Sequence, residues 1–193
     1  MLTLPVRPEL LLLPRTLTTS RLTLRCYNEG DGAAFFNAVH ASRASLSQRL
    51  PWVNSNQSVE DSETYVRKMA AHWLLRTDLV FGMWHEENFV GAVGLHSIQW
   101  QIPSMMMGWF VCDPFENQGF CTEAGLAVKE FAHHHAGAIR VWASCDADNQ
   151  ASERVMQKMG MSLEGKHFCD GRTPQGQLRD SLFYASILKT NQQ

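Results

Sequence analysis

The chain has 193 residues, 45% of them apolar and 19% charged, and it carries a formal net charge of −2. That composition supports one folded domain with a hydrophobic core and excludes a disordered chain. It argues against a protein that binds nucleic acid, which needs an excess of basic side chains to contact phosphates. The apolar run from Leu10 to Leu13 ends at Pro14 and is too short for a membrane span or a signal peptide, so we expect a cytoplasmic protein with no membrane partner.

The first half of the chain predicts two helices and three strands. We expect residues 1–18 to form an N-terminal arm with room for a short edge strand, residues 19–188 one domain, and residues 189–193 a tail. Inside the domain, 20–26 has the composition of a strand and 31–46 has helical periodicity. Ser58 and Asp61 stand where a capping box has its two side chains, which predicts a helix to about Arg76. Strands at 79–84 and 89–100 should follow, joined by a polar turn.

The second half alternates strands and helices. Apolar extended stretches at 105–112 and 139–145 read as strands, and an amphipathic stretch at 122–136 reads as a helix. Asn149 is a suitable N-cap for a further helix, in which Ser152 takes the third position, and Gly160 before Met161 predicts a Schellman stop. A strand at 161–168, a loop at 170–177 and a last strand at 181–188 complete the pattern. We therefore expect an α/β fold, with a mixed sheet covered by helices on both faces.

The polar loop between the strand at 105–112 and the following helix has the features of an anion site. Backbone N–H groups at a helix start have no partner of their own, and the helix dipole adds partial positive charge. Gly119 allows close backbone approach, and the Thr122 hydroxyl can donate a hydrogen bond. The loop lacks the Gly-Lys-Ser/Thr of a Walker A motif and the three glycines of the dinucleotide fingerprint. The sequence thus predicts a phosphate or pyrophosphate held by main-chain donors.

Several segments together resemble a known family. They are Gln-Gly-Phe-Cys-Thr-Glu-Ala at 118–124, Asp-Ala-Asp-Asn-Gln-Ala-Ser at 146–152, Lys-Met-Gly-Met-Ser-Leu-Glu-Gly at 158–165, and the strand segments 19–25, 90–96 and 107–110. Their order and spacing across residues 19–188 resemble the GNAT family of N-acetyltransferases, and within it the RimJ/RimL branch. The resemblance implies a mostly antiparallel sheet with one splayed parallel pair, which is the GNAT fold, and acetyl-CoA as the co-substrate.

The resemblance also implies the residues that hold acetyl-CoA. The backbone of Phe110 and Val111 would pair with the pantetheine arm, and Asn149 would meet the pantetheine or its amide. Ser152 would lie near the thioester sulfur and donate a hydrogen bond to the leaving thiolate. The pyrophosphate would be held by the main-chain amides of Gln118, Gly119, Phe120, Cys121 and Thr122. At a helix start, the Cys121 thiol is expected to have a lowered pKa.

Direct transfer requires a neutral amine, so the general base matters. Branch members often carry Glu two residues before the glycine of the pre-loop strand, where this chain has Met106. His96 and Asp170 are the candidate bases in its place. A protein or peptide α-amine is the leading acceptor, because its pKa of about 7.7–8.0 lies well below the lysine value of about 10.4.

Two other functions stay open at this point. A small amine such as a polyamine, an amino-acid analogue or an antibiotic would use the same chemistry, and a non-catalytic acyl-CoA-binding sensor would not. Neighbouring residues on a helix point in different directions, so His133, His134 and His135 predict a solvated helix end and no metal site. The five cysteines are expected to be free thiols, buried or half-buried. Trp52, Trp84, Trp100 and Trp109 are expected to line an acceptor channel, the core or the contact of a homodimer.

Overall fold

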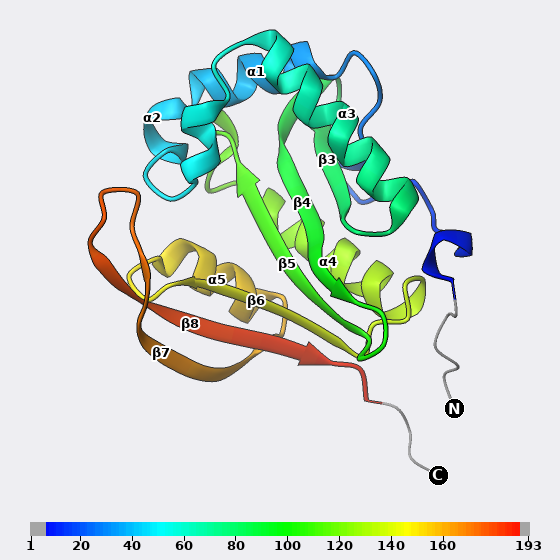
Figure 1. Ribbon diagram of the computed structural model, residues 1–193, viewed down its shortest axis with the longest axis vertical. Helices are drawn as coiled ribbons and strands as arrows, with labels where there is room; N and C mark the ends of the chain where they lie inside the picture. The colour runs from blue at the N-terminus through cyan, green and yellow to red at the C-terminus, as the bar shows by residue number, and fades with distance from the viewer. Residues whose placement is uncertain (1–6, 190–193) are drawn as a thin grey trace.

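Eight strands form one sheet, in the order β1-β2-β3-β4-β5-β6-β8-β7, in the computed structural model, which describes residues 7–189 (Figure 1). Neighbouring strands are antiparallel except β5 and β6, which run parallel. The strands are β1 (Thr16–Thr18), β2 (Thr23–Arg25), β3 (Leu79–His85), β4 (Asn88–Gln99), β5 (Ser104–Val111), β6 (Arg140–Asp146), β7 (Ser162–Arg172) and β8 (Leu178–Ile187). The mixed sheet confirms the expected GNAT architecture.

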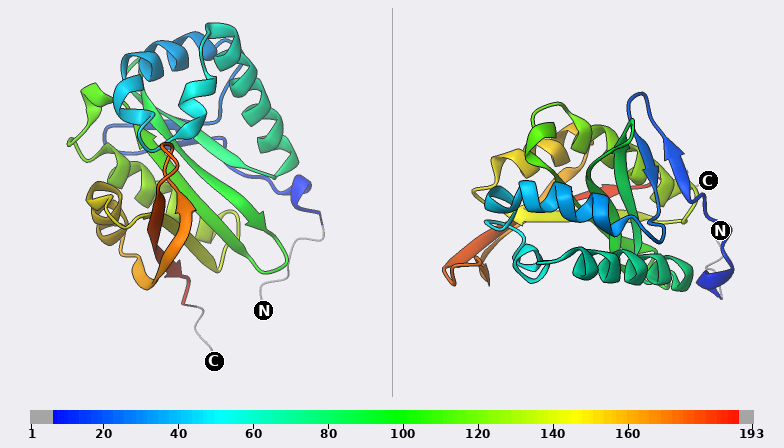
Figure 2. Two further views of the ribbon diagram at one scale, coloured as in Figure 1. Left: turned by 60° about the vertical axis from the view of Figure 1, so that its left-hand side comes forward. Right: turned by 90° about the horizontal axis from the view of Figure 1, so that it is seen from above.

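Helices cover both faces of this sheet (Figure 2). On one face lie α1 (Gly32–Ala41), α2 (Arg43–Leu46) and α3 (Val59–Leu75), and on the other lie α4 (Phe120–His134) and α5 (Gln150–Lys158). Short 3-10 turns occur at Pro8–Leu10, Pro51–Ser55 and Asp113–Phe115. Because both faces are covered, β3 and β4 consist mostly of buried residues rather than alternating apolar and polar ones.

The hydrophobic core has two parts. The larger part includes side chains of the central strands and of α4, among them Phe120, Val128 and Phe131. The smaller part lies under α1 and α3 and is rich in aromatic residues, with Tyr27 and Phe35 fully buried. These two parts of the core hold β5 and α4 in position. The predicted phosphate loop connects β5 to α4.

Three predicted helix boundaries are confirmed. Ser58 caps α3 through a complete capping box with Asp61. Asn149 caps α5, and its side chain accepts a hydrogen bond of 3.1 Å from the Ser152 N–H. After α5, Gly160 has a φ of 73°, and the Met161 N–H bonds the Met156 carbonyl at 3.1 Å, as a Schellman stop requires.

Other boundaries differ from expectation. The helix expected at 31–46 is divided at Ser42, whose hydroxyl accepts a hydrogen bond of 2.9 Å from the Asp113 N–H. The first strand is shorter than expected, and β1 precedes it as an edge strand within the predicted arm. The helix expected to begin at Thr122 already begins at Phe120. The expected loop at 170–177 is shorter, because β7 continues to Arg172.

Two expectations about side chains are also wrong. His133 is buried, with Nδ1 2.7 Å from the Ala138 carbonyl and Nε2 3.2 Å from the Ser186 hydroxyl, while His134 and His135 are exposed. Cys169 is exposed, although the other four cysteines are buried or half-buried, and all five are free thiols.

No helix between residues 7 and 189 is both long enough and apolar enough to cross a membrane.

Candidate active site

The site begins where the parallel pair separates. β5 and β6 pair only through Ser104 with Arg140, Met105 with Val141 and Met106 with Trp142. Beyond these three pairs the strands diverge, as Figure 1 shows, while β5 stays paired with β4 up to Val111. The edge of β5 from Met107 to Val111 that faces away from β4 is therefore open to a ligand. An extended chain that carries amide groups can pair with such an edge.

The loop from β5 to α4 presents main-chain donors at the end of this gap. Gly119 has φ 82° and ψ 4° and precedes α4 without a side-chain cap, and Asn117 has a φ of 59°. In the part of the chain that the structure describes, the backbone N–H groups from Asn117 to Thr122 make no hydrogen bond, and the first bond of the helix is Glu123 N–H to the Gly119 carbonyl at 3.0 Å. A fifteen-residue helix directs its positive dipole end at the same point. These groups suit a pyrophosphate.

An N-terminal turn holds this loop in place, which the sequence did not indicate. The Glu123 carboxylate accepts hydrogen bonds from the Thr19 hydroxyl at 2.6 Å, the Ser20 hydroxyl at 2.9 Å and the Arg21 N–H at 2.9 Å. Arg21 also donates to the Gln118 carbonyl at 2.9 Å. Burial alone would raise the pKa of Glu123, but the hydrogen bonds from Thr19, Arg21 and Ser20 outweigh it and lower this pKa to about 2. The loop therefore depends on residues about a hundred positions earlier in the chain.

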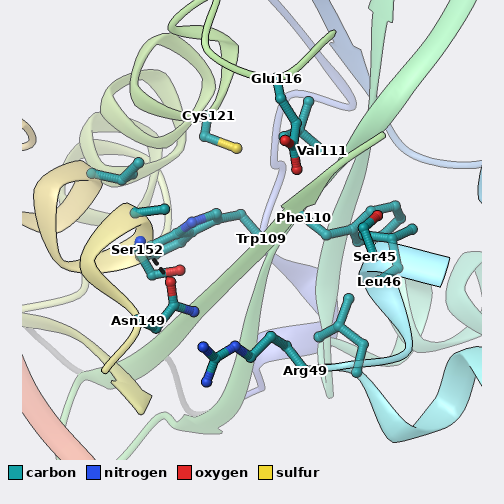
Figure 3. Close-up of a pocket in the computed structure, with 13 residues that line it drawn as sticks. Ser45, Leu46, Arg49, Trp109, Phe110, Val111, Glu116, Cys121, Asn149 and Ser152 are labelled. Carbon is teal, nitrogen blue, oxygen red and sulfur yellow. Dashed lines mark hydrogen bonds between the residues drawn. The ribbon is translucent and has the colours of Figure 1, made fainter. Parts of the chain in front are cut away.

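Two adjoining cavities occupy the gap. The first, called the loop-side cavity, has a volume of about 230 Å³ and is lined by side chains of α2, β5, the loop and α5 (Figure 3). The second, called the strand-end cavity, has a volume of about 240 Å³ and reaches the ends of β6 and β8. Both include Arg49, Leu50, Trp109, Asn149 and Ser152.

The structure brings most of the predicted co-substrate residues together. Phe110, Val111 and Cys121 line the loop-side cavity with Asn149 and Ser152 (Figure 3). The side-chain oxygen of Asn149, Oδ1, accepts the hydrogen bond of the helix cap, which leaves the side-chain NH₂ group available as a donor. Ser152 lines the cavity, and the helix cap uses only its backbone N–H, so the hydroxyl is not engaged by the cap. Gln118, Gly119, Phe120 and Thr122 lie in the loop and first helical turn, where their predicted contribution is from the main chain.

Cys121 differs from expectation in its chemistry. Burial, with the Glu116 carboxylate as a second cause, raises the pKa of the Cys121 thiol to about 12. The expected lowering by the helix start is therefore wrong, and this thiol is protonated near neutral pH. Glu116 lines the same cavity (Figure 3).

The two predicted bases lie elsewhere. The His96 ring packs against Gly94 on β4, and its Nδ1 is 2.7 Å from Asp78 Oδ1. Asp170 belongs to β7, not to a loop, and accepts a hydrogen bond of 2.8 Å from the Ser181 hydroxyl. Among the described residues that line the two cavities, neither His96 nor Asp170 is present.

The sequence analysis did not identify a cluster of three charged side chains in the strand-end cavity. Arg49, from the segment after α2, donates to the Asp146 carboxylate at 2.9 Å, and Arg179 of β8 donates to the other oxygen of Asp146. All three side chains line the strand-end cavity. The three residues are 97 and 33 positions apart, so no local pattern marks them.

The tryptophans separate into different environments. Trp109 lines both cavities. Trp52 stacks on Tyr65 with ring centroids 6.1 Å apart, and Trp84 is buried against Phe89. Trp100 donates to the Arg76 carbonyl at 3.1 Å. Within residues 7–189, no group of three or more His, Cys, Asp or Glu side chains gathers closely enough to hold a metal ion.

The splayed strand pair, the uncapped loop and the cavity between α2 and α5 define an acyl-transferase type of site, and comparison with known families agrees. Residues 21–162 match the family model described as an acetyltransferase (GNAT) domain. The match spans most of the chain, so this protein belongs to the GNAT family and is an acetyltransferase of the GNAT type.

Individual relatives are distant. The uncharacterized N-acetyltransferase YnaD of Bacillus subtilis is 25% identical over 179 residues, which cover 90% of this chain and 96% of the relative. The ribosomal-protein-serine acetyltransferase of Escherichia coli is 23% identical over 147 residues, which cover 75% of this chain and 80% of the relative. The solved structure of RimL, a ribosomal L7/L12 alpha-N-protein acetyltransferase in complex with coenzyme A, shares the fold, with a TM-score of 0.85 and 21% identity over 90% of this chain and 98% of that one.

Proposed function

We propose that this protein transfers the acetyl group of acetyl-CoA to the α-amine of a protein or peptide. The observation that carries the proposal is the separation of β5 from β6 after three pairs, shortly before a loop whose N–H groups have no partner among residues 7–189. The amide-bearing arm and the diphosphate of coenzyme A match these two features. The relative from Escherichia coli that is named as a ribosomal-protein-serine acetyltransferase supports the same class of acceptor.

Each residue of the cavity has a role in this proposal. The free edge of β5 at Trp109 and Val111 pairs with the pantetheine amides, and the Val111 N–H polarises the thioester carbonyl. The Asn149 amide binds the same arm. The amine nitrogen attacks the thioester carbon, the C–S bond breaks, and the thiolate that leaves accepts a hydrogen bond from the Ser152 hydroxyl. Holding the amine next to the thioester supplies much of the acceleration.

An α-amine suits a cavity lined by neither predicted base. With a pKa of about 7.7–8.0 it is substantially neutral near physiological pH, whereas a lysine amine at about 10.4 is not. Its proton can leave to water through the strand-end cavity. We therefore assign no general base among the lining residues, and the roles predicted for His96 and Asp170 are not needed for this acceptor.

The charges of the strand-end cavity argue against a polyamine acceptor. A polycation requires an acidic pocket, but the charged groups in this lining are Arg49, Arg179 and the Asp146 carboxylate that both of them share. Two guanidinium groups would repel a second ammonium group. A peptide terminus brings only the one amine that reacts.

The experiment is release of free thiol from acetyl-CoA in the presence of four acceptors. These are a peptide with a free N-terminus, the same peptide with a blocked N-terminus and an internal lysine, a polyamine, and an aminoglycoside. We expect thiol release with the first, and mass spectrometry should place the acetyl group on its α-amine. Release only with the polyamine or the aminoglycoside would assign the small-amine function. Binding of acetyl-CoA without release for any acceptor would favour the non-catalytic sensor.

A further inference from the structure

The strand-end cavity holds two arginines that the transfer chemistry does not use. Arg49 lies after α2 and Arg179 lies in β8, and both reach the Asp146 carboxylate at the end of β6. Arg49 also contacts Asp148 at 2.7 Å. Because these residues come from separate elements, the fold as a whole brings the two guanidinium groups to one carboxylate.

Both guanidinium groups keep donors free for a ligand. Each has five N–H donors, and the ion pairs use Nη1 of Arg49 and Nη1 of Arg179. Over residues 7–189, no hydrogen bond occupies Nε or Nη2 of either side chain. The exposed fractions of the side chains are 39% for Arg49, 35% for Arg179 and 15% for Asp146, so the arginines are open to the cavity while their shared anchor is mostly covered.

The balance of charge in this lining favours an anion. Asp148 is 76% exposed and does not line the cavity, so solvent screens its charge. Inside the cavity two positive groups face one carboxylate. A ligand carboxylate can take the free guanidinium donors in charge-assisted hydrogen bonds. The same cavity contains Ser152, so such an anion would lie close to the amine that reacts.

Two guanidinium groups near the reacting centre also act on the amine. Nearby positive charge disfavours the protonated form of an amine and lowers its pKa. For an acceptor that carries both a carboxylate and an α-amine, the bound carboxylate and Asp146 together offset this positive charge, so the arginines hold the acceptor rather than deprotonate its amine.

We propose that Arg49 and Arg179, held by Asp146, form the acceptor-specificity site, and that it selects peptides with an Asp or Glu side chain within their first three residues. The inference rests on the proposed function and names the kind of N-terminus that it modifies. The shared chemistry is a carboxylate a few bonds from an amine, which a free amino acid also offers. The preferred source is the peptide, because the partial exposure of both arginine side chains leaves room for a chain that continues into solvent.

The test compares two peptides that differ only in Glu or Gln at the second position, with free glutamate and glutamine amide as small acceptors. We expect kcat/KM to be about 10- to 100-fold higher for the Glu peptide, mainly through KM, from hydrogen bonds to a charged group. Arg179→Gln should bring the two peptides to equal kcat/KM. Gly171→Ala should reduce the preference without a change of charge, because its Cβ would lie 2.7 Å from Arg179 Nε.

The matched control is Arg172→Gln. Arg172 is an exposed arginine at the end of β7, it donates to the Gly176 carbonyl at 2.7 Å, and it is outside the cavity lining. This variant should retain the preference for the Glu peptide. The thermal shift caused by coenzyme A, measured for every variant, shows that each one is folded.

The outcomes separate the inference from the proposed function. Equal rates for the two peptides with the parent protein would overturn the inference, and so would a preference that persists in both Arg179→Gln and Gly171→Ala. Faster acetylation of free glutamate than of the Glu peptide would overturn the peptide as the source of the carboxylate. If coenzyme A binds but no peptide with a free α-amine is acetylated, the proposed function fails and the inference fails with it.

Discussion

Gly119 offers a direct test of the phosphate loop. Its φ of 82° lies in the left-handed region, which costs a residue with a Cβ about 1–2 kcal/mol. A Cβ at this position would meet Arg21 Nη2 at 3.6 Å, an ordinary contact, so the cost of Gly119→Ala comes from the backbone rather than from crowding. For a chain of this length the loss corresponds to a fall in melting temperature of about 2–8 °C. Any rotation that relieves the strain also turns the N–H groups of the next residues away from the phosphate position.

Gly137, just beyond the other end of α4, is the matched control. It has a φ of 73°, and no atom lies within 4 Å of the position of its Cβ. Gly137→Ala should therefore lose a similar amount of stability and bind coenzyme A as the parent does. Gly119→Ala should bind at least about tenfold more weakly, which corresponds to about 1.4 kcal/mol. Titration calorimetry measures both affinities, and equal values for the two variants would refute the placement of the diphosphate.

Three further variants test other parts of the site. Ser152→Ala should lower kcat by about 100-fold, in the range of a lost proton-transfer or hydrogen-bonding partner, with little change in the affinity for coenzyme A, because the helix cap uses only the backbone of this residue; unchanged kcat would remove the hydroxyl from the mechanism. Asn149→Asp should keep the stability of α5, since both residues cap helices equally well, but weaken coenzyme A binding through loss of the amide donor; calorimetry and thermal unfolding separate the two effects. Glu123→Gln should lower the urea midpoint at pH 7. The pKa of Glu123 in the folded protein, about 2, is below its ordinary value of 4.5. The contribution of its ionised carboxylate to the free energy of unfolding is therefore complete above pH 4.5 and disappears as the pH falls towards 2. The difference in urea midpoint between variant and parent should become smaller over that pH interval, and a difference that stays constant would contradict this account.

The sequence was informative where a local pattern sets the geometry. Gly119 before a helix, Asn149 as a cap and Ser152 three residues later all depend on neighbours a few positions away, and the structure places each of them at the gap. The order of strands and helices could be read for the same reason, because hydrophobic periodicity is a local property.

The sequence was silent where the site depends on distant contacts. Glu123 is held by residues 102 to 104 positions earlier, and Arg49 meets Asp146 over 97 positions. The break at Ser42 has the same origin, since its partner Asp113 lies 71 residues further on. His133 was expected at a solvated helix end, but the Ala138 carbonyl and the half-buried Ser186 hydroxyl near the end of β8 contact its ring nitrogens.

The short contact between β5 and β6 has a consequence for the protection of the backbone from solvent. The sheet has one part that contains β1 to β5 and another that contains β6, β8 and β7. Three residue pairs between β5 and β6 join the two parts, and α4 packs across the junction. Beyond these pairs, the backbone groups of β5 that face the cleft have no strand partner within residues 7–189, although the sheet continues on either side. A pantetheine chain in the cleft would supply hydrogen-bond partners for these backbone groups of β5. Main-chain amides of residues 107–111 that point into the cleft should then exchange with deuterium quickly in the free protein and slowly once coenzyme A is bound.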